Sequence, residues 1–179
     1  MAELSEHDKA ILNCVFNPNL PLSETTIEEP ESLEVDVEEN TAEVEETKKL
    51  EIEAIKLAET GKLDEALALL NRALEIAPNR ASIYNNRAHV YQFQRKFTEA
   101  FDDLTKAIEL ARDLQKKTLS QAHCQRGLLH RRASRLESAR EDFEIAAQLG
   151  NRFAKSQLVE LNPYAALCNQ MLRKVMDSL

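Results

Sequence analysis

The stretch that decides the fold is residues 81–110, ASIYNNRAHVYQFQRKFTEAFDDLTKAIEL. In its first half, large, small and large side chains follow one another at spacings of four and three residues: Tyr84, Ala88 and Tyr91. In its second half the order is small, large and small, at Ala100, Leu104 and Ala107. Such spacings place side chains on one face of a helix, and alanines let two helices approach closely. The stretch therefore predicts two helices that pack against each other.

The second-helix pattern occurs three times along the chain. The first alanine stands at positions 66, 100 and 139, the bulky apolar residue at 70, 104 and 143, and the second alanine at 73, 107 and 146. Successive copies are 34 and 39 residues apart, and self-similarity at such a period is typical of repeat architectures. We therefore place repeats at 47–80, 81–114 and 120–153, with an insertion at 115–119.

A period of 34 residues with this small-large-small pattern resembles the tetratricopeptide repeat family. The resemblance implies an all-α fold: an α-solenoid of three tetratricopeptide helix-turn-helix repeats with C-terminal capping helices and an acidic N-terminal arm. The alternative is a generic helical bundle with alanine-rich faces. Composition favours helices in either case, because strong helix formers dominate and only three glycines and 5% aromatic residues are present.

The composition excludes several classes of protein. No apolar run approaches the roughly 20 residues that a membrane helix requires, and residues 1–6 lack the basic and apolar regions of a secretory signal. The odd number of cysteines, Cys14, Cys124 and Cys168, favours a reducing compartment without disulfides. We therefore expect a cytoplasmic protein with no membrane partner, and leave a nuclear location open.

Charge is distributed unevenly along the chain. Residues 23–46 carry eleven acidic side chains and no basic one, whereas residues 47–179 carry 22 basic and 17 acidic side chains. Residues 1–22 are expected to form a short helix with an Asn-Pro stop, and residues 23–46 a disordered linker that runs into the first repeat helix. We hypothesise that this arm folds over third-repeat arginines and competes with acidic ligands; the alternative is a solubilising linker. The arginines are Arg126, Arg131, Arg132, Arg135 and Arg140.

Capping helices are expected at the C-terminal end, over 154–179. The periodicity predicts one helix over 152–161 and a second from Tyr164 to about Asp177, separated by Asn162 and Pro163. A repeat stack leaves its last apolar face uncovered, so a capping segment is required. The alternative is that the final helix binds a partner.

No pattern in the sequence predicts catalysis. The histidines stand at no spacing that forms a metal site with cysteine or carboxylate, and His123 and His130 fall on large packing positions. Glycine-rich phosphate loops and nucleophile elbows are absent from the sequence. We therefore expect no enzyme activity, cofactor or metal. RNA binding would require a continuous basic face and stacking aromatics, of which only Phe93 is well placed, so no nucleic-acid partner is expected.

A stack of helix pairs forms a concave groove from its first helices. Polar amides and arginines in that groove suit the backbone of an extended peptide and an acidic side chain. The candidate peptide-binding residues are Asn85, Asn86, His89 and Phe93 from repeat two, and Gln121, Gln125, Leu128, Arg131 and Arg132 from repeat three. The alternative is a solvated face without a ligand.

Residues 84–88 resemble the corresponding stretch of tetratricopeptide repeat proteins that bind the C-termini of heat-shock chaperones through a carboxylate clamp. That resemblance implies five clamp positions, of which Asn86 alone carries the expected residue. The other four positions hold Glu51, Ile55, Gln121 and Gln125, where the clamp has lysine, asparagine, lysine, and arginine or lysine. The clamp is therefore incomplete.

Blocks along nearly the whole chain resemble the tetratricopeptide repeat protein 36 family. They are FNP at 16–18, ASIYNNRA at 81–88, QRGLL at 125–129 and LNPYAALCN at 161–169, together with the acidic linker. The resemblance implies a non-enzymatic adaptor that associates with Hsp70-class chaperones and protects a client enzyme of tyrosine catabolism. It also implies an alternative, a structural scaffold in cilium assembly. We expect the chain to be a monomer.

Overall fold

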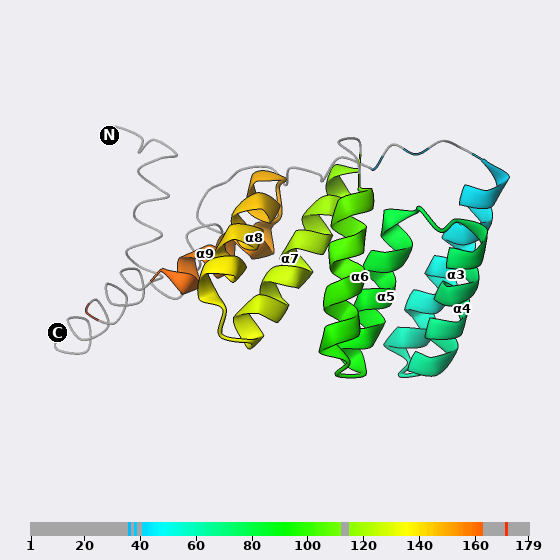
Figure 1. The fold of residues 1–179 in the computed structure, drawn as a ribbon, viewed down its shortest axis with the longest axis horizontal. Helices are drawn as coiled ribbons and strands as arrows, with labels where there is room; N and C mark the ends of the chain where they lie inside the picture. Colours follow the sequence, from blue (N-terminus) through cyan, green and yellow to red (C-terminus); the bar gives the residue numbers. More distant parts are fainter. Residues whose placement is uncertain (1–35, 37, 39–40, 112–114, 163–170, 172–179) are drawn as a thin grey trace, which may run out of the picture.

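The computed structural model describes residues 36, 38, 41–111, 115–162 and 171, and every regular element in these residues is a helix (Figure 1). The helices are α3 (Ala42–Glu59), α4 (Leu63–Ile76), α5 (Ala81–Phe93), α6 (Phe97–Leu110), α7 (Lys116–Arg132), α8 (Leu136–Gln148) and α9 (Arg152–Leu161). They pack as pairs, α3 with α4, α5 with α6 and α7 with α8, and α9 packs against α8. The all-α repeat stack that the sequence predicts is confirmed.

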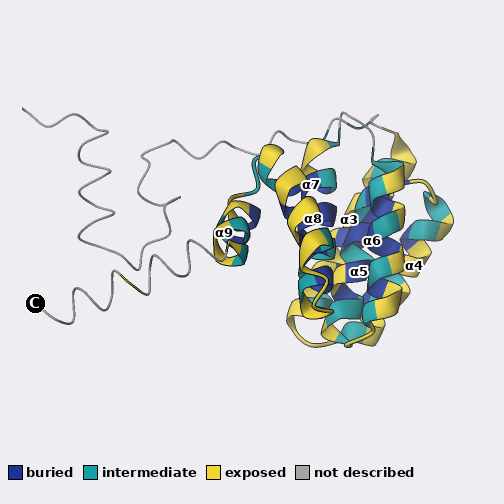
Figure 2. Cartoon of the chain, turned by 60° about the vertical axis from the view of Figure 1, so that its left-hand side comes forward, coloured by how far each residue is buried: buried dark blue, intermediate teal, exposed yellow. Residues whose placement is uncertain are grey.

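Alanines form the contact surface within each pair. Fully buried positions include Ala66, Ala73, Ala100, Ala107, Ala139 and Ala146, together with Leu70, Leu104 and Phe143. Figure 2 shows the buried residues on the helix faces that look toward one another. Because a methyl side chain occupies little space, the backbones come close, and the larger residue between two alanines fills the remaining gap. The predicted alanine seams are therefore present in all three pairs.

Gly127 lies where α7 passes the ring of Phe143 on α8. A β-carbon at residue 127 would lie 2.8 Å from Cε1 of Phe143 and 2.9 Å from its Cδ1. Phe143 is fully buried, so its ring has little freedom to move away. Glycine therefore allows the third repeat to hold a phenylalanine where the other two hold Leu70 and Leu104.

The turns inside the three pairs share one backbone conformation. Gly61, Arg95 and Ser134 have φ angles of 81°, 60° and 59°. In each turn the next N–H donates back to the first helix at 2.9 Å: Lys62 to Leu57, Lys96 to Tyr91 and Arg135 to His130. Glycine adopts a positive φ without steric cost, whereas a residue with a β-carbon adopts it only at a steric cost. Repeats two and three keep the turn in spite of that cost.

Two helices begin earlier than the predicted repeat boundaries. α3 starts at Ala42, where the hydroxyl oxygen of Thr41 accepts a hydrogen bond from the Val44 N–H at 3.3 Å. Glu43 and Glu45 lie in its first turn, where negative charge is favourable. Residues 42–46, predicted as the end of the linker, are thus helical. α7 starts at Lys116, so most of the predicted insertion also belongs to a helix.

α9 occupies the place of the first helix of a fourth repeat. Ala154 is buried at the position that Thr47, Ala81 and Ser120 hold in the three repeats. Oδ1 of Asn151 accepts a hydrogen bond from the Ala154 N–H at 2.9 Å and caps the helix. α9 thereby covers the apolar end of the third pair. The helices predicted within 1–22 and over 164–177 lie outside the described residues, apart from Met171.

Candidate functional site

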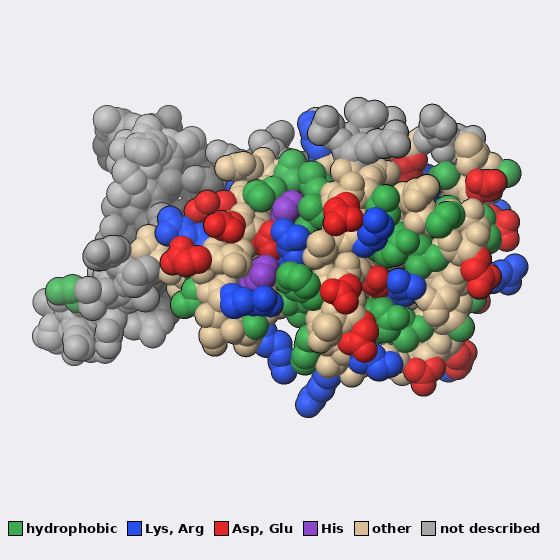
Figure 3. Space-filling view, viewed as in Figure 1, with side chains coloured by type: hydrophobic (Ala, Val, Ile, Leu, Met, Phe, Trp, Pro, Cys, Tyr) green, Lys and Arg blue, Asp and Glu red, His purple; other side chains and the backbone are tan. Residues whose placement is uncertain are grey.

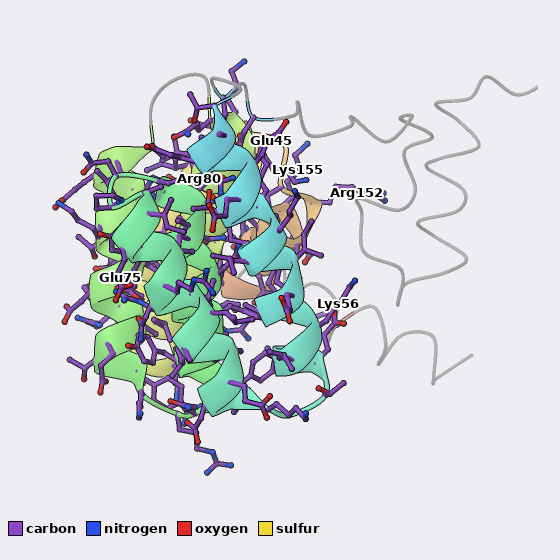
Figure 4. The ribbon with its side chains drawn as sticks, turned by 90° about the vertical axis from the view of Figure 1, so that its right-hand side faces the viewer. Glu45, Lys56, Glu75, Arg80, Arg152 and Lys155 are labelled. Carbon is purple, nitrogen blue, oxygen red and sulfur yellow. The ribbon has the colours of Figure 1, made fainter. Side chains whose placement is uncertain are left out.

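The inner face of the stack is formed by the first helix of each pair. α3 contacts α5 and α5 contacts α7, so these helices lie side by side. Viewed along the stack, α3 lies on one side of the molecule, and α4 and α6 lie on the other (Figure 4). Side-chain chemistry divides the inner face into a polar half near the helix N-termini and an open, more apolar half near the C-termini.

Glu51 of α3 is central to the polar half. Its carboxylate accepts a hydrogen bond from Nδ2 of Asn86 at 2.7 Å and pairs with Nη1 of Arg80. Nη1 of Arg80 also donates to the Thr47 hydroxyl at 3.0 Å, and the Arg80 and Glu51 side chains are 8% and 7% exposed. Burial raises the pKa of Glu51 above its ordinary value although Arg80 opposes the shift. The amide of Asn86, a predicted ligand-binding group, is therefore bonded to this chain's own carboxylate.

Two acidic residues that precede α3, Glu38 and Asp36, contact the body of the stack, and Glu38 contacts the polar half beside Glu51. The oxygens of Glu38 accept from Nε and Nη2 of Arg80, both at 3.0 Å, and Nζ of Lys48 lies 3.0 Å from Oε2. Burial favours a higher pKa for Glu38, but the hydrogen bonds and charges of Arg80 and Lys48 outweigh it and lower the pKa. Figure 4 shows Arg80 beside the upper part of α3. The cations at this end of the groove are thus neutralised internally.

Asp36 reaches the first turn of α7. Its carboxylate accepts hydrogen bonds from the N–H of Lys117 at 2.8 Å and from the N–H of Thr118 at 3.0 Å. The Thr118 hydroxyl donates to the same carboxylate. Since Gln115 provides no side-chain cap to α7, Asp36 acts as its cap from 79 residues earlier in the sequence.

The arginines expected to attract the acidic arm have other partners. Arg126 pairs with Asp142, Arg131 with Glu160, and Arg140 with Glu144, while Arg132 and Arg135 lie over the rings of Phe97 and Phe101. Asp36 and Glu38 contact Arg80, Lys48 and the start of α7 instead. For these two residues the predicted location is therefore wrong, since they bind cations and N–H groups elsewhere.

Predicted groove amides bind one another between α5 and α7. Nδ2 of Asn85 donates to Oε1 of Gln121 at 3.4 Å, and Nε2 of Gln125 donates to Oδ1 of Asn85 at 2.9 Å. Nε2 of Gln92 donates in turn to Oε1 of Gln125 at 2.6 Å. Asn85 is buried, and a buried amide keeps its hydrogen bonds. These residues join repeat two to repeat three.

The half near the helix C-termini is open. A hollow of about 550 Å³ is lined by His89, Gln92, Phe93, Arg95, Phe97, Leu128, Leu129 and Arg132. Phe93 is 56% exposed, and its ring lies edge-to-face against His89, with 4.8 Å between centroids. Ile52 and Ile55 of α3 are also exposed. Of the predicted site residues, the hollow thus brings together His89, Phe93, Leu128 and Arg132.

Arg131, predicted to bind an acidic ligand, contacts α9. Its guanidinium lies 2.9 Å from a carboxylate oxygen of Glu160 and donates to Gln157. α9 supplies these partners because it stands where the first helix of a fourth repeat would stand. Arg131 therefore links the third repeat to its cap.

Repeats two and three each contain a bidentate Arg–Asp pair. Arg87 binds Asp103, with both distances 2.7 Å, and Arg126 binds Asp142 at 2.9 and 2.8 Å. In repeat three, Nδ1 of His123 lies 2.8 Å and Nε2 of His130 lies 3.7 Å from Asp142 oxygens. Figure 3 shows histidine beside acidic and basic side chains on the face viewed there. Arg87 and Arg126 are 39 residues apart in the sequence, and so are Asp103 and Asp142. This shared spacing could have indicated that the Arg–Asp pair is repeated.

The described residues include no group of three or more histidine, cysteine, aspartate or glutamate side chains placed to hold a metal ion. Within them, no helix has the length and apolar character needed to cross a membrane. Burial raises the pKa of the Cys124 thiol to about 11, so this cysteine is neutral near pH 7 and a weak nucleophile.

Comparison with known proteins gives family matches over the repeat region. A TPR repeat family model matches residues 56–94, and a tetratricopeptide repeat family model matches residues 79–152. The chain is 50% identical to the tetratricopeptide repeat protein 36 homolog of Drosophila melanogaster, over 98% of this chain and 96% of that protein. It is 42% identical to tetratricopeptide repeat protein 36 of Homo sapiens, over 97% of this chain and 94% of that protein.

Solved structures with the same fold include peptide complexes. The first TPR of Spaghetti (RPAP3) bound to the HSP90 peptide SRMEEVD is 25% identical, with a TM-score of 0.58 over 67% of this chain and 93% of that one. The second TPR domain of human RPAP3 in complex with the HSP70 peptide SGPTIEEVD is 25% identical, with a TM-score of 0.56 over 67% of this chain and 98% of that one. Together with its full-length relatives, the repeat stack places this chain in the tetratricopeptide repeat protein 36 family.

Proposed function

We propose that this chain is a protein-interaction adaptor that binds a segment of a partner protein in the open half of its inner face. The observation that carries the proposal is the exposure of Phe93, which lines the hollow of about 550 Å³, together with the exposure of Ile52 and Ile55 on the adjacent helix α3. Apolar side chains are rarely gathered on a surface that stays in water, and such patches mark binding sites. The repeat register supports a shared surface, because Ile55, His89 and Leu128 hold equivalent positions on three adjacent helices.

The partner that we propose is an Hsp70-class chaperone, with a client enzyme of tyrosine catabolism, in the cytoplasm. Structural neighbours with HSP70 and HSP90 peptides support a chaperone, and the family resemblance supports the client. The polar half argues against capture of the chaperone's terminal carboxylates. Asn86, Arg80 and Lys48 are already bonded to Glu51 and Glu38, whose negative charge repels a further carboxylate. We therefore propose that the chaperone is bound through another part of its surface.

Affinity purification from cells tests the adaptor role. The bait is the full chain, as wild type and with Phe93→Glu or Ile52→Glu on the inner face. Ile145→Glu is the matched control, because Ile145 is an exposed apolar residue of α8, a second helix. Partners should be lost at least tenfold from both inner-face variants and retained by the control, with circular dichroism showing equal helix content. Equal recovery in all four samples would contradict binding at this face.

Purified components test the chaperone. An Hsp70 that lacks its last four residues should bind the chain as tightly as intact Hsp70. In a separate experiment, the half-life of the client enzyme should shorten in cells without the adaptor. Loss of binding of the Hsp70 without its last four residues would show that the terminal carboxylates are used after all.

Recovery of ciliary structural proteins without a chaperone in the affinity purification would favour the scaffold role in cilium assembly. Sedimentation of the purified chain tests the expected monomer.

A further inference from the structure

A second hollow adjoins the first between repeats two and three. It measures about 410 Å³ and is lined by Phe97, Thr98 and Phe101 of α6 and by Leu129, Arg132, Ala133 and Arg135 of the third repeat. Phe97, Leu129 and Arg132 line both hollows. We call the two hollows together the inter-repeat cleft. It is lined by the residues of the second hollow and by His89, Gln92, Phe93, Arg95 and Leu128 of the first. Its size suits a few bulky side chains.

The inter-repeat cleft is positively charged in an acidic protein. Among the residues that the structure describes, its lining contains Arg95, Arg132 and Arg135 and no carboxylate, although the whole chain has a formal net charge of -8. Among the described residues, the structure records no ion pair for any of these three arginines. Other arginines of the third repeat, such as Arg126 and Arg131, are paired with acidic groups. Charge complementarity therefore favours an acidic occupant.

The aromatic rings hold two of the arginines in place. Cζ of Arg132 lies 4.0 Å from the centroid of the Phe97 ring, and Cζ of Arg135 lies 5.3 Å from that of Phe101. A guanidinium stacked on a ring keeps its N–H edges available, and those edges match a carboxylate in a bidentate geometry. The rim of the cleft thus presents ordered cations, and the rings and leucines supply an apolar floor.

Arg95 reaches the cleft from a turn position that favours glycine. Its φ is 60°, and the equivalent residue of repeat one is Gly61, with φ of 81°. A side chain is accommodated there at a steric cost. The positive charge at residue 95 is therefore present in spite of an unfavourable backbone conformation.

We propose that the inter-repeat cleft binds an acidic segment of a partner protein in which a bulky apolar side chain is flanked by glutamate or aspartate. The apolar side chain enters the hollow and the flanking carboxylates bind Arg132 and Arg135. The segment is recognised through its side chains and needs no free C-terminus. This inference rests on the proposed adaptor function and specifies its ligand.

Fluorescence anisotropy with a defined probe tests the inference. The probe is a fluorescein-labelled peptide, Gly-Glu-Glu-Phe-Glu-Glu-Gly, with its C-terminus amidated, and the protein is the full chain. Arg132→Gln and Arg135→Gln should each raise Kd about fivefold, the change expected for loss of one partly exposed ion pair. Arg140→Gln is the matched control, since Arg140 is exposed on α8 and pairs with Glu144. It should leave Kd unchanged.

Changes in the probe separate the two parts of the recognition. Replacing phenylalanine by alanine should weaken binding, and so should replacing the glutamates by glutamine. The inference would be overturned if the wild-type protein did not bind the probe. It would also be overturned if a peptide with lysine in place of glutamate bound as tightly as the probe, or if Arg140→Gln raised Kd as much as Arg132→Gln and Arg135→Gln. Tighter binding of an oligouridylate than of the peptide would also overturn it, in favour of RNA. If the peptide fails while Phe93→Glu still loses cellular partners, the ligand chemistry is wrong and the adaptor function stands.

Discussion

Gly127 shows how one residue limits what the third repeat can hold. Alanine at this position would place its β-carbon 2.8 Å from the Phe143 ring, inside the van der Waals contact distance. Alanine improves helix propensity by roughly 1 kcal/mol, but overpacking of a core costs about 1–3 kcal/mol. We expect Gly127→Ala to lower the free energy of unfolding by up to about 2 kcal/mol, measured by urea denaturation.

The same ring provides the control. In the double variant Gly127→Ala/Phe143→Leu, the smaller side chain that repeats one and two use should remove the clash. The penalty of the alanine should therefore be smaller in the leucine background than in the wild type. An equal penalty in both backgrounds would show that the ring is not its cause.

His130 makes stability depend on pH. Burial lowers its pKa below the ordinary 6.5, Arg135 and Arg126 act in the same direction, and Asp142 and Glu141 oppose them. The unfolded chain therefore binds the proton more tightly than the folded chain. The stability that depends on neutral His130 is therefore complete above pH 6.5, and it is lost as the pH falls from there through the lowered pKa of the folded chain. We expect the melting temperature of the wild type to fall more between pH 7.5 and 5.5 than that of His130→Phe.

Parallel pH profiles would show that His130 does not titrate differently in the folded and unfolded chains. Asp142 cannot produce the effect, because its pKa lies below the ordinary 3.8: burial opposes that shift, and His123 and Arg126 outweigh it.

Single residues also show where prediction from sequence stops. Repeat register predicts the buried alanines, because their packing role depends only on the face that they occupy. It also predicts that Asn86 and Arg131 lie on the inner side. Register cannot predict that Asn86 is hydrogen-bonded to Glu51 or that Arg131 is paired with Glu160. These bonding partners lie on neighbouring helices, and their positions depend on how the helices pack. Four candidate site residues therefore meet in the hollow, and the others bond to the chain itself.

At the scale of elements, α7 depends on a cap that is distant in sequence. Asp36 accepts hydrogen bonds from the N–H groups of Lys117 and Thr118, and its charge favours the helix N-terminus. We expect Asp36→Ala to destabilise the first turn of α7 by about 1 kcal/mol, because alanine accepts no hydrogen bond through its side chain. Amide hydrogen exchange should accelerate at 117–119 and remain unchanged in the first turn of α8. Unchanged exchange at 117–119 would show that the contact does not hold the turn.

Helix boundaries illustrate a second limit of prediction. The repeat period fixes the cores of α3 and α7, but both helices extend by about one turn before the expected start. Thr41 caps the first extension locally, and that signal is readable in the sequence. Asp36 caps the second from another part of the chain, and no local pattern reveals such a contact.

At the scale of the whole molecule, the acidic segment before α3 connects the first repeat to the third. Glu38 binds Arg80 and Lys48, and Asp36 binds α7. We expect a chain that begins at Thr41 to be less stable than the wild type by about 1–2 kcal/mol. Because the Arg80 and Glu38 side chains are largely buried, the difference in melting temperature should persist in roughly 0.5 M salt, which screens exposed charges far more than buried ones.

A chain that begins at Val35 is the matched control, because it retains both Asp36 and Glu38. It should melt close to the wild type. A similar loss of stability in both truncated chains would assign the effect to residues 1–34. The comparison thus separates two defined contacts from the remainder of the acidic segment.

The spacing of α3, α5 and α7 sets a length for a ligand on the inner face. Neighbouring helices pack at about 8–10 Å, so the row from Ile55 across His89 to Leu128 measures about 20 Å. An extended polypeptide advances about 3.3 Å per residue, which gives a footprint of about six residues. Beyond that row, Glu160 and Gln157 of α9 bond to Arg131. A short linear motif would fill the row, and a longer ligand would continue along α9, which takes the place of a fourth first helix.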